Sequence, residues 1–226
     1  MASMKAVFFD LDGLLADTED LHVIAYETVG RYLHIDLPRD YVRSFIGGPT
    51  RENIKRIMRE YSIPMERFDE ILKVRYNSYM EAIRSTVLYP MDGALDCVLH
   101  VRGRQYKTAL VTSSIREHAL AVLENLSKHW NSGREVVSLF NTMVFGDEIE
   151  HLKPAPDIYI EALRRVEVPP ESGIALEDSE FGVMAARRAG LYVIAVPGPH
   201  TSEQSFSTAN EIACSLTEVV QRGLIA

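Results

Sequence analysis

The sequence predicts an α/β fold in which a doubly wound parallel sheet, a Rossmann-like core, carries an inserted α-helical cap domain. Three features predict it: short apolar runs without polar alternation, helical segments between the later runs, and one long helical stretch after the first run. Strands that are apolar throughout are typical of parallel sheets with helices on both faces. The 226 residues, 46% of them hydrophobic, suffice for such a core and exclude a disordered or fibrous chain.

Five apolar runs are expected to form strands, at 6–9, 108–111, 142–145, 174–176 and 192–196. Helices are expected between the later strands, at 115–126, 155–166 and 181–189. Ser114 and Glu117 have the spacing of a capping box at a helix start. Gly190 stands where the end of a helix favours a left-handed residue. These signals support an alternation of strand and helix.

Residues 16–88 carry helical periodicity without a convincing strand, and they are too many for a loop. Amphipathic helices are expected at 21–33, 51–61 and 67–83, separated by turns that contain proline or glycine. We therefore expect a core domain made of 1–15 and 89–226 and a helical cap domain made of 16–88. The polar segment 127–138, with Trp130 in its middle, is expected to be a surface excursion.

Charge and cysteine content restrict the class of protein. The chain has 32 Asp+Glu against 24 Lys+Arg, a net charge of -8, which opposes broad contact with nucleic acid or an anionic membrane. No apolar run approaches the roughly 18 residues that cross a bilayer, and we find no signal-peptide cleavage region. Cys97 and Cys214 lack disulfide or zinc-site spacing, so we expect two buried, inert thiols in a cytoplasmic protein.

Two carboxylates, Asp10 and Asp12, follow the first predicted strand at the strand period, so both can point toward one place. In open α/β sheets, function concentrates at the carboxyl ends of the strands. An EF-hand loop starting at Asp10 is excluded, because its sixth and twelfth positions are Leu15 and Leu21 instead of glycine and glutamate. A pair of aspartates that only caps the turn is the alternative.

Glu177 and Asp178 form a second acid pair, at the end of the fourth predicted strand. An ordinary helix N-cap at Asp178 or Ser179 would explain this pair taken alone. In a parallel sheet, however, both acid pairs lie at the same edge, where they repel each other unless a hard cation neutralises them. Mg²⁺ is the expected occupant.

Lys153 precedes a proline-stiffened helix start and can balance a nucleophilic aspartate and an incoming phosphate. A solvated lysine before such a helix is the alternative. Thr112, Ser113 and Ser114 end the second predicted strand and offer hydroxyls and N–H groups at a helix amino terminus, where anions bind. Helix capping is the competing explanation, and we expect it to account for Ser114.

Taken in order, four motifs resemble those of the haloacid dehalogenase superfamily of phosphohydrolases, in the helical-cap subgroup near the β-phosphoglucomutase-like members. They read FFDLDGLLADT (8–18), LVTSS (110–114), KPAPDIY (153–159) and ALEDSEFG (175–182). The resemblance implies a Mg²⁺-dependent phosphatase of small phosphorylated metabolites, such as sugar phosphates or nucleotide-derived monophosphates. We expect a monomer and, from the net charge, no nucleic acid or membrane partner.

The resemblance also implies a role for each matching residue. Asp10 would be the nucleophile that takes the phosphoryl group, and Asp12 the acid/base. Thr112 and Lys153 would hold the phosphoryl group, with Ser113 as a further substrate contact. Mg²⁺ would be bound by these acidic positions: Asp10, the backbone carbonyl of Asp12, Asp178 and, in support, Glu177.

In the cap, the resemblance gives Arg51 contact with a second anionic group of the substrate. A solvated basic face shared with Lys55, Arg56 and Arg59 is an equal alternative. Arg75 is a weaker candidate for the same contact, and an exposed helix arginine is the favoured alternative. Three histidines lack metal-ligand spacing, are expected to be on the surface or partly buried, and receive no role: His22, His118 and His151.

The substrate and the exact reaction stay open at this point. Leu152 stands where the family commonly has glycine, and the turn at 89–93 is longer than the usual one. A phosphosugar mutase of the β-phosphoglucomutase type would use the same residues. A non-catalytic phosphate-binding regulatory module is an alternative of another class, and Asp12 argues against a metal-free dehalogenase.

Overall fold

The computed structural model describes residues 4–129 and 135–225, and its centre is one parallel sheet. The strands pair in the order β3-β2-β1-β4-β5-β6. The five strands expected from the sequence are confirmed to within one residue at each end. A sixth, two-residue strand was not expected. The strands are β1 (Ala6–Phe9), β2 (Lys107–Thr112), β3 (Thr142–Phe145), β4 (Gly173–Glu177), β5 (Tyr192–Ala195) and β6 (Glu211–Ile212).

Helices cover both faces of the sheet. On one face pack α5 (Ala94–Gly103), α6 (Arg116–His129) and α9 (Leu216–Gln221), and on the other α7 (Asp157–Val166) and α8 (Glu180–Arg188). Neighbouring residues of β1 point to opposite faces, since Phe8 belongs to the core under α7 and α8 and Phe9 to the core under α5 and α6. The predicted doubly wound α/β core is therefore confirmed.

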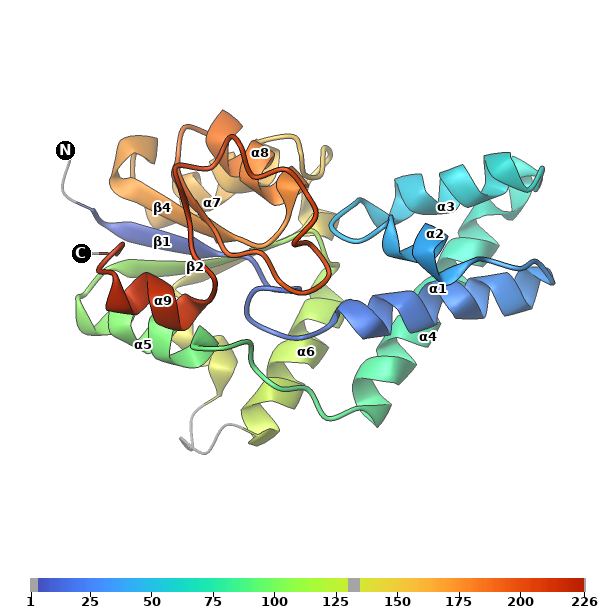
Figure 1. Cartoon of the computed structure of the whole chain (residues 1–226), viewed down its shortest axis with the longest axis horizontal. Coiled ribbons are helices and arrows are strands. Elements are labelled where there is room, and N and C mark those ends of the chain that lie inside the picture. The colour runs from blue at the N-terminus through green and yellow to red at the C-terminus, as the bar shows by residue number, and fades with distance from the viewer. Residues whose placement is uncertain (1–3, 130–134, 226) are drawn as a thin grey trace.

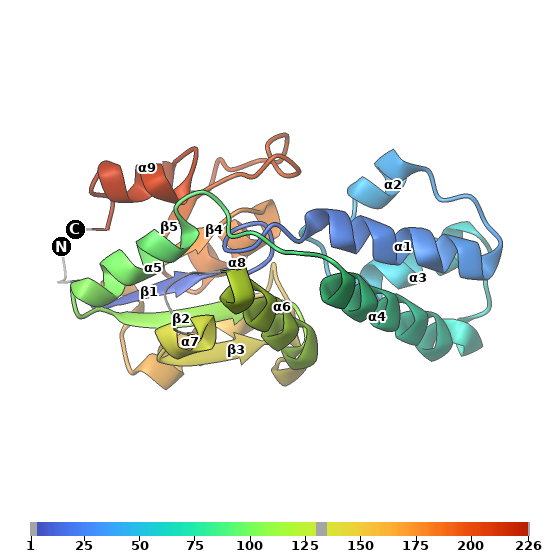
Figure 2. The same cartoon turned by 90° about the horizontal axis from the view of Figure 1, so that it is seen from below.

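Four further helices form a separate layer, which we call the cap: α1 (Glu19–Leu33), α2 (Arg39–Arg43), α3 (Thr50–Glu60) and α4 (Phe68–Ser85). Figures 1 and 2 both show the cap beyond one end of the sheet. It has its own apolar core, which includes Ile54, Ile57 and Ile71. These helices lie inside the segment 16–88 that the sequence predicts to be helical.

Asn125, a buried side chain of α6, fixes the point where the chain returns from the cap. Its Oδ1 accepts a hydrogen bond from the N–H of Leu88 at 3.0 Å. Its Nδ2 donates to the carbonyl oxygens of Ile83 and Thr86, both at 2.8 Å. The link between α4 and the core is thus held by a core side chain.

Three expectations need correction. Cys214 is exposed at the edge of the sheet, between β6 and α9, whereas Cys97 is buried as expected. The helices α2, α5 and α9 were not expected, although the buried residues of α5 recur at helical spacing. In the segment 127–138, α6 continues to His129 and Val136 is buried, while Trp130 lies outside the described residues. No helix in the described ranges is long and apolar enough to span a membrane.

Candidate active site

A cavity of about 470 Å³ lies between the carboxyl ends of the core strands and the cap. Core and cap residues both line it. Every residue to which the sequence assigns a site role lines the cavity except Glu177, which is buried beside it. The cavity therefore gathers the four motifs together with Arg51: Asp10, Asp12, Arg51, Thr112, Ser113, Lys153 and Asp178.

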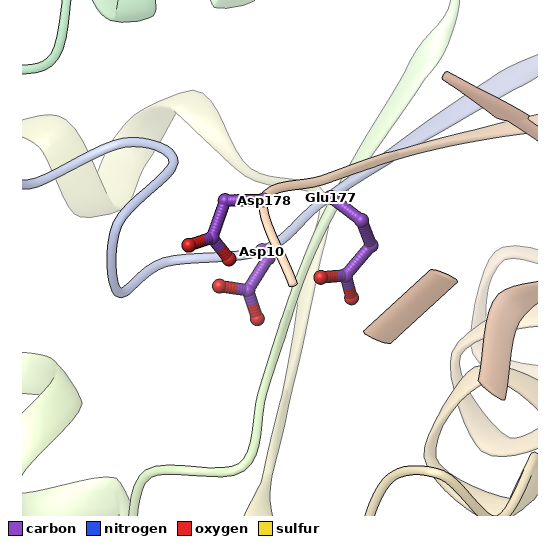
Figure 3. Close-up of side chains that lie close together, drawn as sticks. All are labelled: Asp10, Glu177 and Asp178. Carbon is purple, nitrogen blue, oxygen red and sulfur yellow. The ribbon is translucent and has the colours of Figure 1, made fainter. Parts of the chain in front are cut away.

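Three acidic side chains meet at the ends of β1 and β4. The parallel register places Phe9 beside Leu176, so the residues that follow, Asp10 and Glu177, are neighbours at the sheet edge. Asp10, Glu177 and Asp178 are all buried, and one carboxylate oxygen of each lies within 4.8 Å of the others (Figure 3). Acids from the two predicted pairs thus meet at one edge, and three of the four belong to the cluster: Asp10, Glu177 and Asp178.

Lys153 inserts its buried ammonium among these acids. Its Nζ donates to Asp10 Oδ1 at 2.5 Å, to Glu177 Oε1 at 2.6 Å and to the carbonyl oxygen of Val111 at 3.0 Å. The hydroxyl of Tyr159 donates to the same oxygen of Glu177. Glu177 therefore positions Lys153 through one oxygen, which the sequence did not predict.

The electrostatics of the cluster favour a cation. Burial raises the pKa of Asp10 to about 8, against the lowering effect of Lys153, and Glu177 and Asp12 add to the rise. Burial and then the charge of Asp10 raise the pKa of Asp178 well above its usual range. Because several buried carboxylates repel one another, and because carboxylate oxygens are hard donors, these residues fit a hard divalent cation such as Mg²⁺.

Asp12 is surrounded by hydroxyl groups from both core and cap. Its Oδ1 accepts hydrogen bonds from Thr18 at 2.8 Å and Tyr79 at 3.1 Å, and its Oδ2 from Ser114 at 2.7 Å and Thr112 at 3.3 Å. His22 Nε2 lies 3.6 Å from Oδ1.

Burial alone would raise the pKa of Asp12. The hydrogen bond and charge of His22, together with the hydrogen bonds of Ser114 and Thr18, outweigh burial and hold this pKa well below its usual range. Asp12 is therefore ionised in this arrangement. The sequence missed Thr18, Tyr79 and His22, because nothing local marks them as partners of Asp12.

The helix cap expected at Ser114 is not observed. Its hydroxyl donates to Asp12, and its N–H donates to the hydroxyl of Thr112 at 3.0 Å. The first N–H of α6, at Arg116, is instead capped by Asp147 Oδ1 at 2.9 Å.

Arg75 is buried, only 2% exposed, and this corrects the expectation of an exposed helix arginine. Its guanidinium lies 4.8 Å from the ring centroid of Tyr79 and 5.1 Å from that of Tyr26, and it contacts His22 Nδ1. Within the described part of the chain, its Nε has no hydrogen-bond partner. Since Arg75 also lines the cavity, it is a second cap cation at the site.

The histidines differ from expectation in part. His118 is buried and packs edge-on against Tyr76 and Tyr79, and burial lowers its pKa to about 4. His22 stacks on Tyr79 with ring centroids 4.3 Å apart. His151 is exposed, as expected, and pairs with Asp157 at 3.1 Å.

Arg51 lies in the first turn of α3, exposed, with its guanidinium 4.7 Å from the ring centroid of Phe68. Its helix neighbours form surface ion pairs, Lys55 with Glu52 at 2.6 Å and Arg56 with Glu60 at 3.0 Å. Arg51 lines the cavity and they do not, so the basic face is solvated while Arg51 alone of this face reaches the site.

Glu19 is a further buried carboxylate that lines the cavity and that sequence reasoning missed. Burial, then the charges of Asp12 and Asp10, raise its pKa to about 8. Gly13 lies between Glu19 and Asp178: a Cβ at Gly13 would lie 2.3 Å from Asp178 Oδ2, and its φ is +79°. The only sequence signal for Glu19 is its place in the first turn of α1, which is common for any acidic residue.

The chain is similar to several known proteins. A family model described as "Haloacid dehalogenase-like hydrolase" matches residues 7–196. A phosphorylated carbohydrates phosphatase from Thermotoga maritima is 34% identical over 83% of this chain and 82% of its own length. A "Probable pseudouridine-5'-phosphatase" from Drosophila melanogaster is 33% identical over 93% of this chain and 89% of its own length.

Among solved structures, a CbbY mutant from Rhodobacter sphaeroides in complex with xylulose-(1,5)bisphosphate has a TM-score of 0.80. The two chains are 28% identical, and the match covers 96% of each.

Proposed function

Since the chain belongs to the haloacid dehalogenase-like hydrolases and is a phosphoric monoester hydrolase, we propose that it is a Mg²⁺-dependent phosphatase of small phosphorylated metabolites, acting through a phospho-aspartate at Asp10. Sugar phosphates and nucleotide-derived monophosphates are the proposed substrate classes. The observation that carries the proposal is the convergence of Asp10, Asp178 and Lys153 at the floor of one cavity.

Asp10 is suited to attack phosphorus. Lys153 holds Oδ1, and within residues 4–129 and 135–225 no hydrogen bond is made to the side-chain oxygen Oδ2. In the first step, Oδ2 forms a bond to phosphorus while the bond from phosphorus to the ester oxygen breaks. The leaving oxygen takes a proton from Asp12.

Asp12 must therefore gain a proton before this step, although it is ionised in the arrangement described above. An arriving phosphate dianion raises the pKa of a nearby carboxyl, which favours that uptake. In the second step, Asp12 as a carboxylate takes a proton from water, the water oxygen bonds to phosphorus, and the bond to Asp10 breaks. Phosphate and free Asp10 result.

The remaining residues hold the phosphoryl group. Lys153, Thr112 and Ser113 line the cavity near Asp10 and offer an ammonium and hydroxyl donors. When bound, Mg²⁺ would be held by Asp10, Asp178 and the backbone carbonyl of Asp12, with Glu177 in support, and would neutralise charge on the phosphoryl oxygens.

On the cap side of the cavity, we propose that Arg51 contacts a second anionic or polar group of the substrate. Support comes from its place in the cavity lining and from its guanidinium having no ion pair with a described carboxylate. Arg75, which is buried in the cap and also lines the cavity, can contribute a second positive charge to this contact.

The proposal is tested by phosphate release from a panel of sugar and nucleoside monophosphates, with Mg²⁺ or with EDTA, for the wild type and for Asp10→Asn. We expect release that needs Mg²⁺ and is absent in the variant. If β-glucose 1-phosphate and glucose 6-phosphate interconvert without net phosphate release, the chain is a mutase instead. If the wild type releases no phosphate from any ester, the phosphatase proposal is wrong.

A further inference from the structure

One of the contacts between the cap and the core is made by a short turn that precedes α3. We call residues 45–48 the cap loop; they lie between α2 and α3, and Arg51 follows them by three positions. We infer that Gln204 is a positioning residue that latches the cap loop onto the core and thereby places Arg51 over the site. The inference rests on the proposed function, because the latch acts on the proposed hydrolytic site.

Gln204 bridges the two parts with its side-chain amide. Its Oε1 accepts a hydrogen bond from the N–H of Glu180, the first residue of α8, at 2.8 Å. Its Nε2 donates to the carbonyl oxygen of Ile46 in the cap loop at 3.3 Å. One side chain therefore ties the cap to the helix that begins two residues after Asp178.

A second observation shows how closely the cap loop approaches the core here. A Cβ added to Gly47 would lie 2.9 Å from the Cβ of Ser179, and Gly47 has a φ of +79°. Ser179 is the N-cap of α8 and accepts the N–H of Gly182 at 3.2 Å. Only glycine allows the cap loop to lie directly on the turn that carries Asp178.

Each partner of the latch also has hydrogen bonds within its own part of the protein. On the core side, Thr201 and Phe206 are buried on either side of Gln204, and the N–H of Gln204 donates to the carbonyl of Thr201 at 2.9 Å. On the cap side, Asn53 Nδ2 donates to the carbonyl oxygens of Phe45 at 3.2 Å and Gly48 at 3.4 Å. The bond between Gln204 and Ile46 thus joins two parts of the protein and limits the movement of the cap loop away from the core.

The latch controls where Arg51 stands relative to Asp10. The cap loop and the first turn of α3 are contiguous, so a cap loop that lifts from Ser179 carries Arg51 with it. Gln204 itself does not line the cavity and touches none of the proposed reacting atoms. Its loss is therefore expected to weaken substrate binding more than it slows the chemical step.

The test uses Gln204→Glu in the full-length protein. This isosteric change keeps an oxygen for the N–H of Glu180 but replaces the amide donor by an oxygen that faces the Ile46 carbonyl. Ser202→Glu is the matched control, because it adds the same charge at an exposed position of the same loop, where the Ser202 hydroxyl donates to the Pro199 carbonyl at 3.5 Å.

Amide hydrogen exchange of the peptide covering 44–53, measured without substrate, is the first readout. We expect exchange to be roughly three- to tenfold faster in Gln204→Glu, as for loss of one hydrogen bond, and unchanged in Ser202→Glu. The second readout is hydrolysis, with Mg²⁺, of a sugar bisphosphate, the kind of ester whose second phosphate Arg51 would contact. Its KM should rise by a similar factor while kcat changes by less than about twofold.

Exchange in Gln204→Glu that equals the wild-type rate would overturn the latch. A lower kcat at unchanged KM would overturn it too, because Gln204 would then act on the chemistry. A wild type that hydrolyses nothing would contradict the proposed function and leave the exchange experiment to decide on the latch by itself.

Discussion

The ammonium of Lys153 lies 2.5 Å from Oδ1 of Asp10, although 143 positions separate the two residues in the chain. The same ammonium forms an ion pair with Glu177, so one buried cation pairs with two buried carboxylates. This arrangement is consistent with a proposed nucleophile whose unused oxygen is free to react, and it makes Lys153 important for stability as well as activity.

Replacing Lys153 by methionine should abolish turnover and lower the free energy of unfolding by roughly 3 kcal/mol, since it leaves buried carboxylates without their cation. Urea unfolding without Mg²⁺ and phosphate release measure the two effects. Lys107→Met is the control, because Lys107 is exposed and, among the described residues, its Nζ donates a hydrogen bond only to the Val166 carbonyl. Equal stability of the two variants would show that Lys153 does not stabilise the acid cluster.

Asp10→Asn should reduce turnover by more than about a thousandfold, because an amide oxygen cannot form the phospho-aspartate. The fold should survive, with the unfolding free energy changed by no more than about 1 kcal/mol, since the amide oxygen can still accept from Lys153. Mass spectrometry after brief reaction should find phosphate on the wild type and none on the variant. Phosphate attached elsewhere in the chain would exclude Asp10 as the nucleophile.

Asp178→Asn should weaken Mg²⁺ binding by more than about tenfold. Loss of a residue that only supports a metal ligand can already weaken binding about tenfold, and Asp178 is a proposed ligand itself. Isothermal calorimetry with Mg²⁺ measures the affinity without reference to activity. Glu203→Gln, which removes one exposed carboxylate from the surface, is the control and should bind Mg²⁺ as the wild type does. Unchanged affinity in Asp178→Asn would place the metal somewhere else.

Arg51→Ala should change the preference between substrates more than the hydrolysis of p-nitrophenyl phosphate, because Arg51 stands at the cap side of the cavity. The ratio of kcat/KM for a sugar bisphosphate to that for p-nitrophenyl phosphate should fall roughly tenfold. Arg59→Ala is the control, since Arg59 is exposed on the same helix and does not line the cavity. An equal loss on both esters would remove Arg51 from substrate choice.

His118 makes stability depend on pH. Burial lowers its folded-state pKa to about 4, below the unfolded value of 6.5. Between pH 4 and 6.5 the unfolded chain binds more protons than the folded chain. The free energy of unfolding is therefore unaffected by this group above pH 6.5 and decreases as the pH falls toward 4. The loss amounts to at most about 3 kcal/mol.

His118→Phe should therefore flatten the decline of unfolding free energy between pH 6.5 and 4, as measured by urea unfolding at several pH values. The control is His151→Gln, at an exposed position, which should leave the decline nearly unchanged. A His118→Phe curve parallel to that of the wild type would show that other groups cause the dependence.

Much of the core and of the acid cluster could be predicted from the sequence, because both depend on residues that are consecutive in the chain. A run such as Ala6–Phe9 is apolar at every position, and Asp10 and Asp12 follow it directly. Once the strands are taken as parallel, their carboxyl ends must share an edge, so the meeting of Asp10 with Glu177 and Asp178 follows from the pairing rule. Short elements such as β6 and α2 carry too few residues to show a period.

Other features depend on contacts between distant segments, and only the tertiary structure decided them. Tyr79 reaches Asp12 across 67 positions, and Gln204 reaches Ile46 across 158. Arg75 has the local sequence of an exposed helix residue, yet it is buried because Tyr26 and Tyr79 flank its guanidinium from two cap helices. Apolar period and motif order determine which strands form and where acids gather, whereas the burial and partners of a single side chain depend on how the cap packs on the core.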